Sequence, residues 1–579
     1  MTRNGSNRTK TALALVVLTL VAAPSRAQTN DARIQELVRA AAERIGAGQA
    51  VSGAPPSASQ NAAPGTVLPL SLDDAVKLAL ERNLDIAVQR LNPQTFDYSL
   101  AGLYGNYKPA LTSQVVTQSV VNPTANTLQG VPPGELGITQ GTTTGNAGIT
   151  QNLLWGGGGY ALTLNNNKQT TNSTTSTLNP SYNTSYSAQY TQPLLRGFKI
   201  DTTRQQIVVT RLNQEISETQ LQASIINTLS NVRNAYWDYV YAIQAVDVAK
   251  QSLDLASKLV QDNQTRVEVG TMAPIDVVQA QSEAATRRQT LVAAEATRRT
   301  TELALKRLIV AGTQDPTWDS NIDPTDRPEF RQEPIDVAAA VRRALSARTD
   351  LAIAKKNLNS NEVTVKLLKN QLMPQADFIA RYGLVGRGGT GITRSGTGLG
   401  TSQSQILNIT PGGLGDAFNT MFANDYPTWS FSLNFAYPLG KSTAEANVAR
   451  ANIQQGQVQA QLKQLELQVA TDVTSAAITA QTNGEAVQAA QAARELGQKK
   501  LEAEQSKFEV GMSTNYFVVQ AQRDLRDAQI SELRAVLNYR KALVEFERLQ
   551  QTTLQNLNIT LINAAGGGAT TRTTTSGGQ

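Results

Sequence analysis

The 579-residue chain contains neither cysteine nor histidine. The lack of cysteine excludes disulfide bonds and acylation of an N-terminal cysteine, so we expect no lipoprotein. The lack of histidine removes the most frequent general base and the commonest metal ligand. The sequence also shows no glycine-rich phosphate loop at a strand–helix junction and no nucleophile elbow. These absences argue against an enzyme, and no cofactor or metal is expected.

Long hydrophobic runs are missing too. After residue 27, the sequence has no stretch of 18 consecutive apolar residues, so we expect no membrane-spanning helix. If the chain crosses a membrane, it must therefore do so as a closed β-barrel.

The N-terminal segment 1–27 is predicted to be a cleaved signal peptide. Three basic residues precede the apolar run Thr11–Ala23, and Ser25–Ala27 resembles a cleavage site. A membrane anchor is the alternative, but the run is too short to span about 30 Å. Removing the four basic residues of this segment leaves 48 basic and 46 acidic residues, a net charge of +2 instead of +6. This balance does not indicate nucleic-acid binding.

One segment of the chain occurs twice. Aligned without gaps, Val267–Gln281 (VEVGTMAPIDVVQAQ) and Phe508–Gln522 (FEVGMSTNYFVVQAQ) are identical at 8 of 15 positions. Leu70–Arg90 resembles Ile335–Lys356 as well. A repeat of about 250 residues predicts a duplicated domain, because solenoid units are much shorter.

Each half is predicted to contain one very long helix and a second helix that returns. Residues 204–266 contain neither proline nor glycine, and such a helix would be roughly 90–100 Å long. Small and apolar residues recur there at coiled-coil spacing: Val246, Ala249, Leu253, Ala256, Val260 and Val267, with Asn263 in the same register. The last helix has two such seams, which favours a helix with a neighbour on each side. An ordinary two-helix coiled coil is the alternative.

Alternating polarity predicts strands at about 110–121, 182–194, 375–387 and 428–439. Four strands cannot close a barrel with a lumen, so several copies of the chain must supply strands jointly. Aromatic residues on these strands are expected to form a girdle at the membrane interface: Tyr186, Tyr190, Trp429, Phe431, Phe435 and Tyr437.

The sequence resembles the TolC family of outer-membrane efflux and secretion ducts. The resemblance rests on LSLDDAVKLALERN from Leu70, QPLLRGF from Gln192, and RVEVGTMAPIDVVQAQS from Arg266 with its repeat at Phe508, and it covers roughly Leu70–Leu549. It implies an α+β membrane protein with two internal repeats. Long helical hairpins would form a periplasmic α-barrel, and the strands would belong to a trimeric transmembrane β-barrel of 12 strands, four from each chain.

The resemblance implies the passive exit duct of a tripartite efflux pump or a type I secretion system. Such a homotrimer lies in the outer membrane, with most of its chain in the periplasm, and works with a periplasmic adaptor and an inner-membrane transporter. A periplasmic coiled-coil adaptor or scaffold is the alternative, and an enzyme is a distant third. The cargo stays open between drug, metal, siderophore and polypeptide. The absence of histidine and cysteine, with only 5 methionines, argues mildly against a soft-metal relay.

The expected boundaries follow the repeat. They are a signal peptide at 1–27, an N-terminal helix and Pro/Ala-rich linker at 28–69, a first repeat at 70–312, a linker or equatorial segment at 313–333, a second repeat at 334–556, and a disordered tail at 557–579. An additional hairpin at 148–169 is expected to decorate the barrel. The alternative is that it enlarges the barrel to six strands per chain.

The two EVG turns, at 268–276 and 509–517, are predicted to form the periplasmic tips. There the duct closes and meets its adaptor, through Val269, Gly270, Thr271, Val510, Gly511 and Met512. The two glycines permit a tight reversal, or serve only as helix C-caps. The predicted gate residues are Phe508, Ser513, Tyr516, Phe517 and Gln520.

The predicted gate departs from the polar gate that the family resemblance implies. Phe508, Ser513, Phe517 and Gln520 stand where family members with a polar gate have a tyrosine, an arginine and two acidic residues. We therefore expect closure through apolar contacts of Phe508, Tyr516 and Phe517, without charge pairs. A family aspartate is kept as Asp276, for which we favour the role of a helix N-cap.

Overall fold

The computed structural model describes residues 67–573 except 124–129, 133, 328–329, 332–333, 396–404, 441 and 563–569. The predicted signal peptide and N-terminal helix lie outside the described residues. The chain divides into two compact units, and the larger one, Pro64–Thr560 with Thr571–Gln579, contains nearly all of the described residues.

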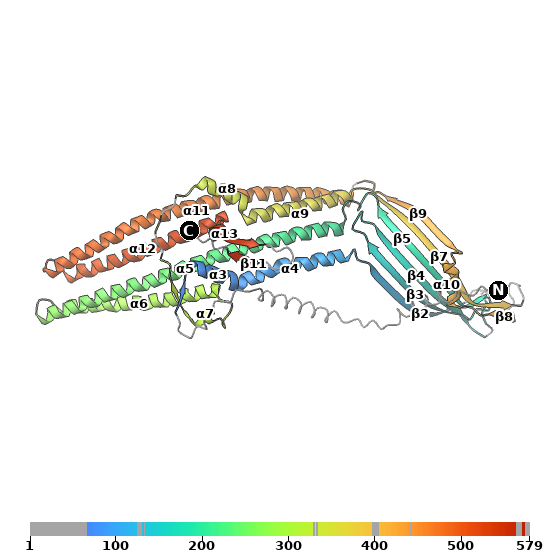
Figure 1. Cartoon of the computed structure of the whole chain (residues 1–579), viewed down its shortest axis with the longest axis horizontal. Helices are drawn as coiled ribbons and strands as arrows, with labels where there is room; N and C mark the ends of the chain where they lie inside the picture. Colours follow the sequence, from blue (N-terminus) through green and yellow to red (C-terminus); the bar gives the residue numbers. More distant parts are fainter. Residues whose placement is uncertain are drawn as a thin grey trace, which may run out of the picture. The chain divides into compact units, whose positions relative to one another are not determined.

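Two long helical hairpins dominate the larger unit (Figure 1). In each hairpin a helix of 67 residues runs to a tight turn, and a helix of 36 residues returns beside it. At 1.5 Å per residue, the longer helix spans about 100 Å. The first hairpin consists of α5 (Thr202–Glu268) and α6 (Pro274–Ile309), and the second of α11 (Thr443–Glu509) and α12 (Asn515–Gln550).

Shorter helices occupy the part of α5 and α11 that the returning helices leave uncovered. α4 packs beside α5, while α9 packs beside both α5 and α11. Each is preceded by a helix of 11 residues, and only one residue separates the two helices. The pairs are α3 (Leu72–Arg82) with α4 (Leu84–Gly105), and α8 (Val337–Ala347) with α9 (Thr349–Gln371).

A small apolar core lies beside the middle of α5. The parallel strands β1 (Val67–Leu70) and β6 (Asn321–Pro324) pair there. Buried tyrosines of α5 hold them: Tyr236 Oη donates to the Leu70 carbonyl at 3.1 Å, and Tyr239 Oη donates to the Ile322 carbonyl at 2.6 Å. This core therefore joins the start of the described chain to the segment between the two halves.

The remaining short elements are helices and a strand pair. The C-terminal segment predicted to be disordered contains two short strands, which form a two-stranded sheet. Its β-branched isoleucine and threonine residues favour strands. These elements are α7 (Pro316–Asp319), α10 (Leu414–Phe422), α13 (Thr553–Asn556), β10 (Ile559–Ile562) and β11 (Thr570–Thr573).

The other strands form a single antiparallel sheet at the end of α5 and α11 away from the tips (Figure 1). Their order is β2-β3-β4-β5-β7, and β7 then pairs with β9 along one half and with the short β8 along the other. The strands are β2 (Ala110–Pro123), β3 (Gly137–Asn152), β4 (Gly159–Thr171), β5 (Leu178–Pro193), β7 (Gln375–Arg394), β8 (Ile406–Thr410) and β9 (Pro427–Ala436).

The additional hairpin does not decorate the sheet. The expected segment 148–169 forms most of β4 and the end of β3, and these two strands lie between β2 and β5. The expectation of decoration was wrong because 137–147, rich in Thr and Gly and poor in apolar residues, was not identified as a strand. Its backbone pairs with β2 over the full length of both strands.

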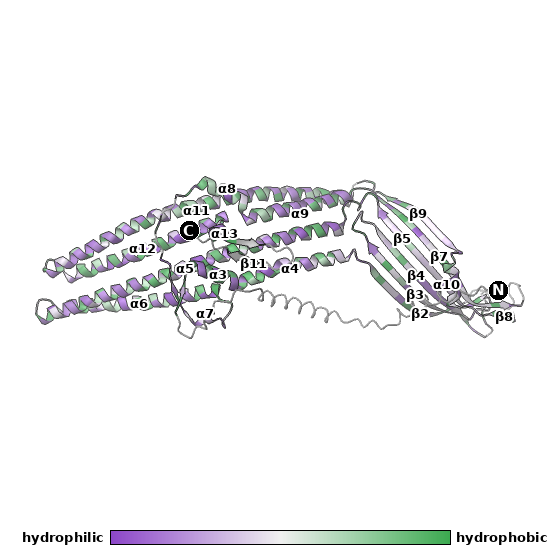
Figure 2. Ribbon diagram, viewed as in Figure 1, coloured by the Kyte–Doolittle hydropathy of each residue, from purple (hydrophilic) through white to green (hydrophobic). Residues whose placement is uncertain are grey.

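Hydrophobic and hydrophilic residues are interspersed along all four long helices (Figure 2). Within the described part of the chain, we find no helix that combines the length and the apolar character needed to cross a membrane.

Candidate functional site

The two tip turns have the same backbone hydrogen bonds. In the first, the amide of Gly270 donates to the Val267 carbonyl and the amide of Thr271 donates to the Arg266 carbonyl. In the second, the corresponding donors are Gly511 and Met512, and the acceptors are Phe508 and Lys507. This pair of bonds defines a Schellman C-cap, which satisfies the last carbonyls of a helix while the chain reverses. The repeated sequence therefore encodes a repeated turn.

Both turn glycines adopt the left-handed conformation, with φ of 79° at Gly270 and at Gly511. A Cβ atom at either position would meet open space, so the requirement for glycine is conformational rather than steric. The two interpretations of these glycines, as reversal and as C-cap, thus describe the same geometry.

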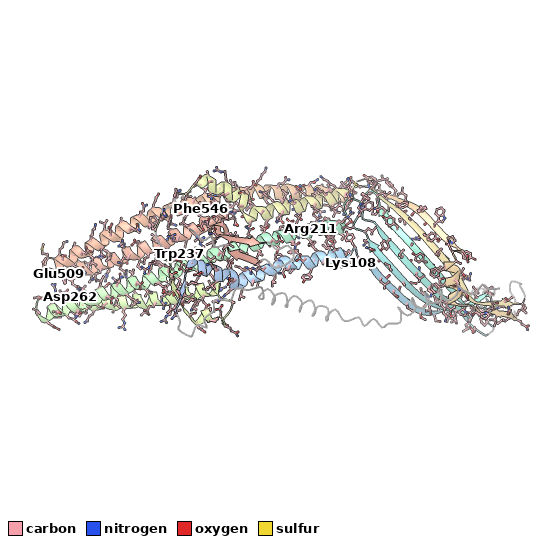
Figure 3. All side chains as sticks on the ribbon, viewed as in Figure 1. Lys108, Arg211, Trp237, Asp262, Glu509 and Phe546 are labelled. Atoms are coloured by element: carbon pink, nitrogen blue, oxygen red, sulfur yellow. The ribbon has the colours of Figure 1, made fainter. Side chains whose placement is uncertain are left out.

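Apolar side chains of both turns are exposed in the single chain. The exposed fraction is 74 % for Val269, 70 % for Val510 and 79 % for Met512. Ile275, Tyr516 and Phe517, at the start of the returning helices, are more than half exposed as well. Figure 3 labels Asp262 and Glu509 close to the ends of the two hairpins. Exposed apolar residues gathered in this way are typical of a protein-binding surface.

Among the predicted gate residues, Phe508 joins the two hairpins. Its ring is 7 % exposed and packs in one cluster with Leu259 of α5 and Val518 of α12. The guanidinium carbon of Arg266 lies 4.4 Å from the ring centroid, which is a cation–π contact. Phe508 thus makes an apolar contact within one chain, together with a cation that was not predicted, and its role in closing the duct stays a prediction.

The other predicted gate residues stay within the second hairpin. Ser513 Oγ donates to Glu504 Oε2 at 2.8 Å, and Gln520 Nε2 donates to Asp524 Oδ1 at 2.8 Å. Tyr516 and Phe517 pack edge to face, with ring centroids 5.5 Å apart, and both are exposed. The described contacts of these four residues in one chain therefore all lie within the second hairpin.

The prediction that Asp276 is an N-cap is wrong. The N-cap residue of α6 is Ala273, whose side chain makes no capping hydrogen bond. Pro274 takes the first helical position, because its missing amide hydrogen would be unsatisfied there anyway. Asp276 follows in the first turn of α6, where its negative charge interacts favourably with the positive end of the helix dipole.

A buried ion cluster, missed in the sequence, connects the hairpins just behind the tips. Glu283 of α6 is 5 % exposed and pairs with Arg287 of the same helix, which is 3 % exposed. From α12, Arg523 reaches across, with its Nε 3.2 Å from Glu283 Oε2. Burial raises the pKa of the Glu283 carboxyl, but the hydrogen bond and charge of Arg523 and the charge of Arg287 lower it more. The net pKa lies below the ordinary value, so Glu283 is ionised at neutral pH.

A buried amide pair forms the second polar link. Asn263 of α5 and Asn515 of α12 are almost fully buried, and Asn263 Nδ2 donates to Asn515 Oδ1 at 3.0 Å. Asn515 Nδ2 in turn donates to the Asp276 carbonyl at 3.3 Å. A buried asparagine in a helical seam fixes which residues face each other, at a cost in stability.

Arg266, Phe508, Glu283, Arg523, Asn263 and Asn515 together form what we call the inter-hairpin cluster. The predicted closure rests on apolar contacts without charge pairs, and within one chain a cation faces Phe508 and an ion pair lies behind it. A signal existed in the sequence: Asn263 occupies a seam position, and Glu283 and Arg287 follow Ala280 at seam spacing.

A family model described as "Outer membrane efflux protein" matches residues 160–310 and 340–550, more than half of the chain. The chain belongs to this family. The resemblance to TolC-like channels is thereby confirmed, and so is the expectation of a passive duct that catalyses no reaction. This membership displaces the alternatives of a periplasmic adaptor and of an enzyme.

Solved structures of outer membrane channels share the fold of this efflux-family chain. The CmeC channel of Campylobacter jejuni has a TM-score of 0.56 and 14% identity, over 84% of this chain and 88% of that one. VceC of Vibrio cholerae has a TM-score of 0.54 and 13% identity, over 83% of this chain and 95% of that one. MtrE of Neisseria gonorrhoeae, in its open state, has a TM-score of 0.54 and 15% identity, over 83% of this chain and 88% of that one. No curated protein matches the chain significantly.

The residues predicted as an aromatic girdle lie along one side of the sheet of this outer membrane efflux protein. Trp429, Phe431 and Phe435 alternate along β9 and are 66–71 % exposed. Tyr437 follows just after the strand, while Tyr186 and Tyr190 lie in β5 and are half-buried. The aromatics thus form a row along the strands and are not confined to the strand ends.

Proposed function

We propose that the chain is the outer-membrane exit duct of a tripartite efflux pump or a type I secretion system. Family membership carries this proposal, and the matched segments contain both helical hairpins. Three copies would assemble, with their strands in the outer membrane and their helices in the periplasm. An adaptor and an inner-membrane transporter would deliver the cargo, and the duct itself would conduct passively.

The equal helix lengths support an assembly with two equivalent hairpins per chain. Both long helices have 67 residues and both returning helices have 36, so the two tips can end at the same level. We infer that the two hairpins arose from an internal repeat. Six tips in a trimer would then form one ring. The adaptor would bind this ring through Val269, Gly270, Thr271, Val510, Gly511 and Met512.

We infer that the inter-hairpin cluster holds the duct closed. Its contacts join the first hairpin to the second within one chain, close to the tips, so separating the hairpins breaks them. Opening would be a shift in population, which an adaptor can drive only if it binds the separated tips more tightly than the closed ones. Tyr516, Phe517, Ser513 and Gln520 would then contact the neighbouring chain or the lumen.

Single-channel conductance in planar bilayers, with native mass measured on the same sample, tests the duct. A trimeric mass with a small and rarely opening conductance is expected. A monomer or dimer without conductance would overturn the proposal.

Phe508→Ala tests the gate in the same bilayers. It removes an almost fully buried ring, at a cost of about 3 kcal/mol to the contact, so we expect a marked increase in open time. Val267→Ala is the matched control, because Val267 holds the same place in the first turn and is only partly buried. Equal effects of the two substitutions would refute a special role for Phe508.

A further inference from the structure

The hairpin β3–β4 is built into the sheet along its whole length. Every residue of β2 has a partner in β3, and the ladder continues through β4 to β5. β2 and β5, which would be neighbours in a four-stranded arrangement, are therefore separated by two complete strands.

The turn of this hairpin is fixed to the loop that leads into α5. The bond from the Leu153 amide to the Gly158 carbonyl closes a loop of four residues, in which Gly156 and Gly157 have the positive φ that glycine adopts readily. The buried side chain of Gln192 donates to the Gly156 carbonyl at 2.8 Å. A Cβ atom on Gly157 would lie 2.5 Å from the Gly197 carbonyl oxygen, so the two backbones touch. The hairpin is thus anchored at the helical end of the sheet.

The hairpin also continues the two faces of the sheet. Residues opposite each other in an antiparallel ladder point to the same side. The ladder carries one face from Phe431 through Ala380, Tyr190 and Tyr160 to Gln151. In β3 and β4 its next two rows are apolar, Leu162 with Ile149 and Leu164 with Ala147, and the rows farther from the helices carry Asn166 and Lys168. Trp155 in the turn is 73 % exposed and packs against Phe198. The part of this face nearer the helices suits lipid, with aromatic residues near the helical end.

The opposite face is polar. Arg381 donates to Gln189 at 2.6 Å on this side, and Thr163 and Ser187 lie with their Oγ atoms 2.8 Å apart. Along the described strands β3 and β4, the polar face carries threonine, asparagine and glutamine and no charged residue: Gln140, Thr142, Thr144, Asn146, Thr150, Thr163, Asn165, Asn167 and Gln169. A face of this kind suits a water-filled lumen.

The outer edges of the sheet fit each other. In the described sheet, β2 pairs only with β3 and β9 only with β7, and all residues of both strands are exposed. Every pairing from β2 to β9 is antiparallel, so across six strand positions the two edge strands run in opposite directions. β9 of one copy can therefore pair antiparallel with β2 of the next, with the apolar faces continuous.

We infer that three copies close through β2 and β9 into a barrel of 18 strands, six from each chain, where the family resemblance implies 12. This inference rests on the proposed trimeric duct. Because barrel diameter grows roughly linearly with strand number, the barrel would be about 1.5-fold wider than one of 12 strands. On the face that would line the lumen, β3 and β4 are uncharged, while β7 adds Arg381 and Arg387. The greater width would favour bulky polar cargo, such as a polypeptide.

Engineered disulfides test the strand order, since the natural chain has no cysteine. Ser432→Cys in β9 is combined with Thr112→Cys, Gln114→Cys or Gln118→Cys in β2, all on the polar face. After oxidation of purified, membrane-reconstituted protein, at least one combination should give covalent trimers on a denaturing gel. Thr163→Cys with Ser187→Cys should close within one chain and leave monomers.

The alternative arrangement has its own signature. If the hairpin leaves the wall in the assembled duct, β2 contacts β5, and Gln114→Cys should form a disulfide with Ser185→Cys or Ser187→Cys within one chain. That result in a protein of trimeric native mass would overturn the 18-stranded barrel and spare the duct. A native mass other than a trimer would instead overturn the proposed function itself.

Discussion

The two halves of the chain match in their helices and differ in their strands. Their long helices have the same length, and so do their returning helices. In contrast, the first half contributes β2, β3, β4 and β5 to the sheet, while the second contributes β7, β9 and the short β8. In the proposed duct the helices bring two tips to one level, so a length change in one half would alter the alignment of both tips. An added hairpin leaves the direction of both sheet edges unchanged, because it inserts an even number of strands.

The two tips repeat this contrast on a smaller scale. Their backbone hydrogen bonds are the same, yet the side chains behind them differ at corresponding positions. Glu283 faces the other hairpin, whereas Asp524, which corresponds to it at the offset of 241, binds Lys500 and Gln520 in its own hairpin. The two hairpins thus share the backbone geometry of the turn, whereas the side chains of the inter-hairpin cluster differ between them.

The largest effect is expected from Glu283→Ala. The substitution leaves Arg287 buried without its partner, and breaking a buried ion pair in this way costs about 3–5 kcal/mol. Unfolding in guanidinium, followed by the helical circular dichroism signal, should show that loss. Glu485→Ala, at an exposed position of α11, should change the free energy of unfolding by less than about 0.5 kcal/mol. Similar values for the two variants would show that the ion cluster does not stabilise the contact between the hairpins.

Asn263→Leu is expected to act next most strongly. It leaves the buried Asn515 amide short of a partner, at a cost of about 1–3 kcal/mol. Asn263→Leu combined with Asn515→Leu should recover most of this loss, because both polar groups are then removed. A double-mutant cycle measures the coupling, and simple additivity of the two changes would contradict a direct link.

Much of the helical architecture could be predicted from the sequence, because seam spacing and the repeated turn are local signals. The partners across the hairpins could not, since Arg523 reaches Glu283 over 240 residues of chain. The strand β3 was missed for a different reason. Its Thr- and Gly-rich sequence has no clear alternation of apolar residues, and its pairing with β2 determines its place. The prediction that Asp276 caps α6 was wrong because the helix already begins at Pro274.

Smaller and equal effects are expected at the two turn glycines. Gly270→Ala and Gly511→Ala each place a side chain at a φ of 79°, which costs about 1–2 kcal/mol. Thermal unfolding should show the same loss for both variants, because the two turns share their geometry. Gly456→Ala, inside α11 with open space around it, should instead stabilise by about 0.5–1 kcal/mol. A loss at one tip only would mean that the turns are not equivalent.

The smallest effect is expected from pH, and it separates the two corresponding acids. The pKa of Glu283 lies below its ordinary value of 4.5, so the ionised carboxylate stabilises the contact between the hairpins fully above that pH. The stabilisation is lost as the pH falls through the lower, folded-state pKa, when the link to Arg287 and Arg523 loses its charge. Open time in bilayers should therefore stay constant from pH 7 to about 5 and rise below about 4.5.

Glu283→Gln should lack this acid step, since no carboxyl remains to titrate between the hairpins. The pKa of Asp524 is also lowered, through the hydrogen bond from Lys500, but that bond stays within one hairpin. Asp524→Asn should thus keep the acid step of the natural chain. If instead Asp524→Asn abolished it and Glu283→Gln did not, the acid-sensitive link would lie within the second hairpin, and the contacts that distinguish the two tips would have to be reassigned.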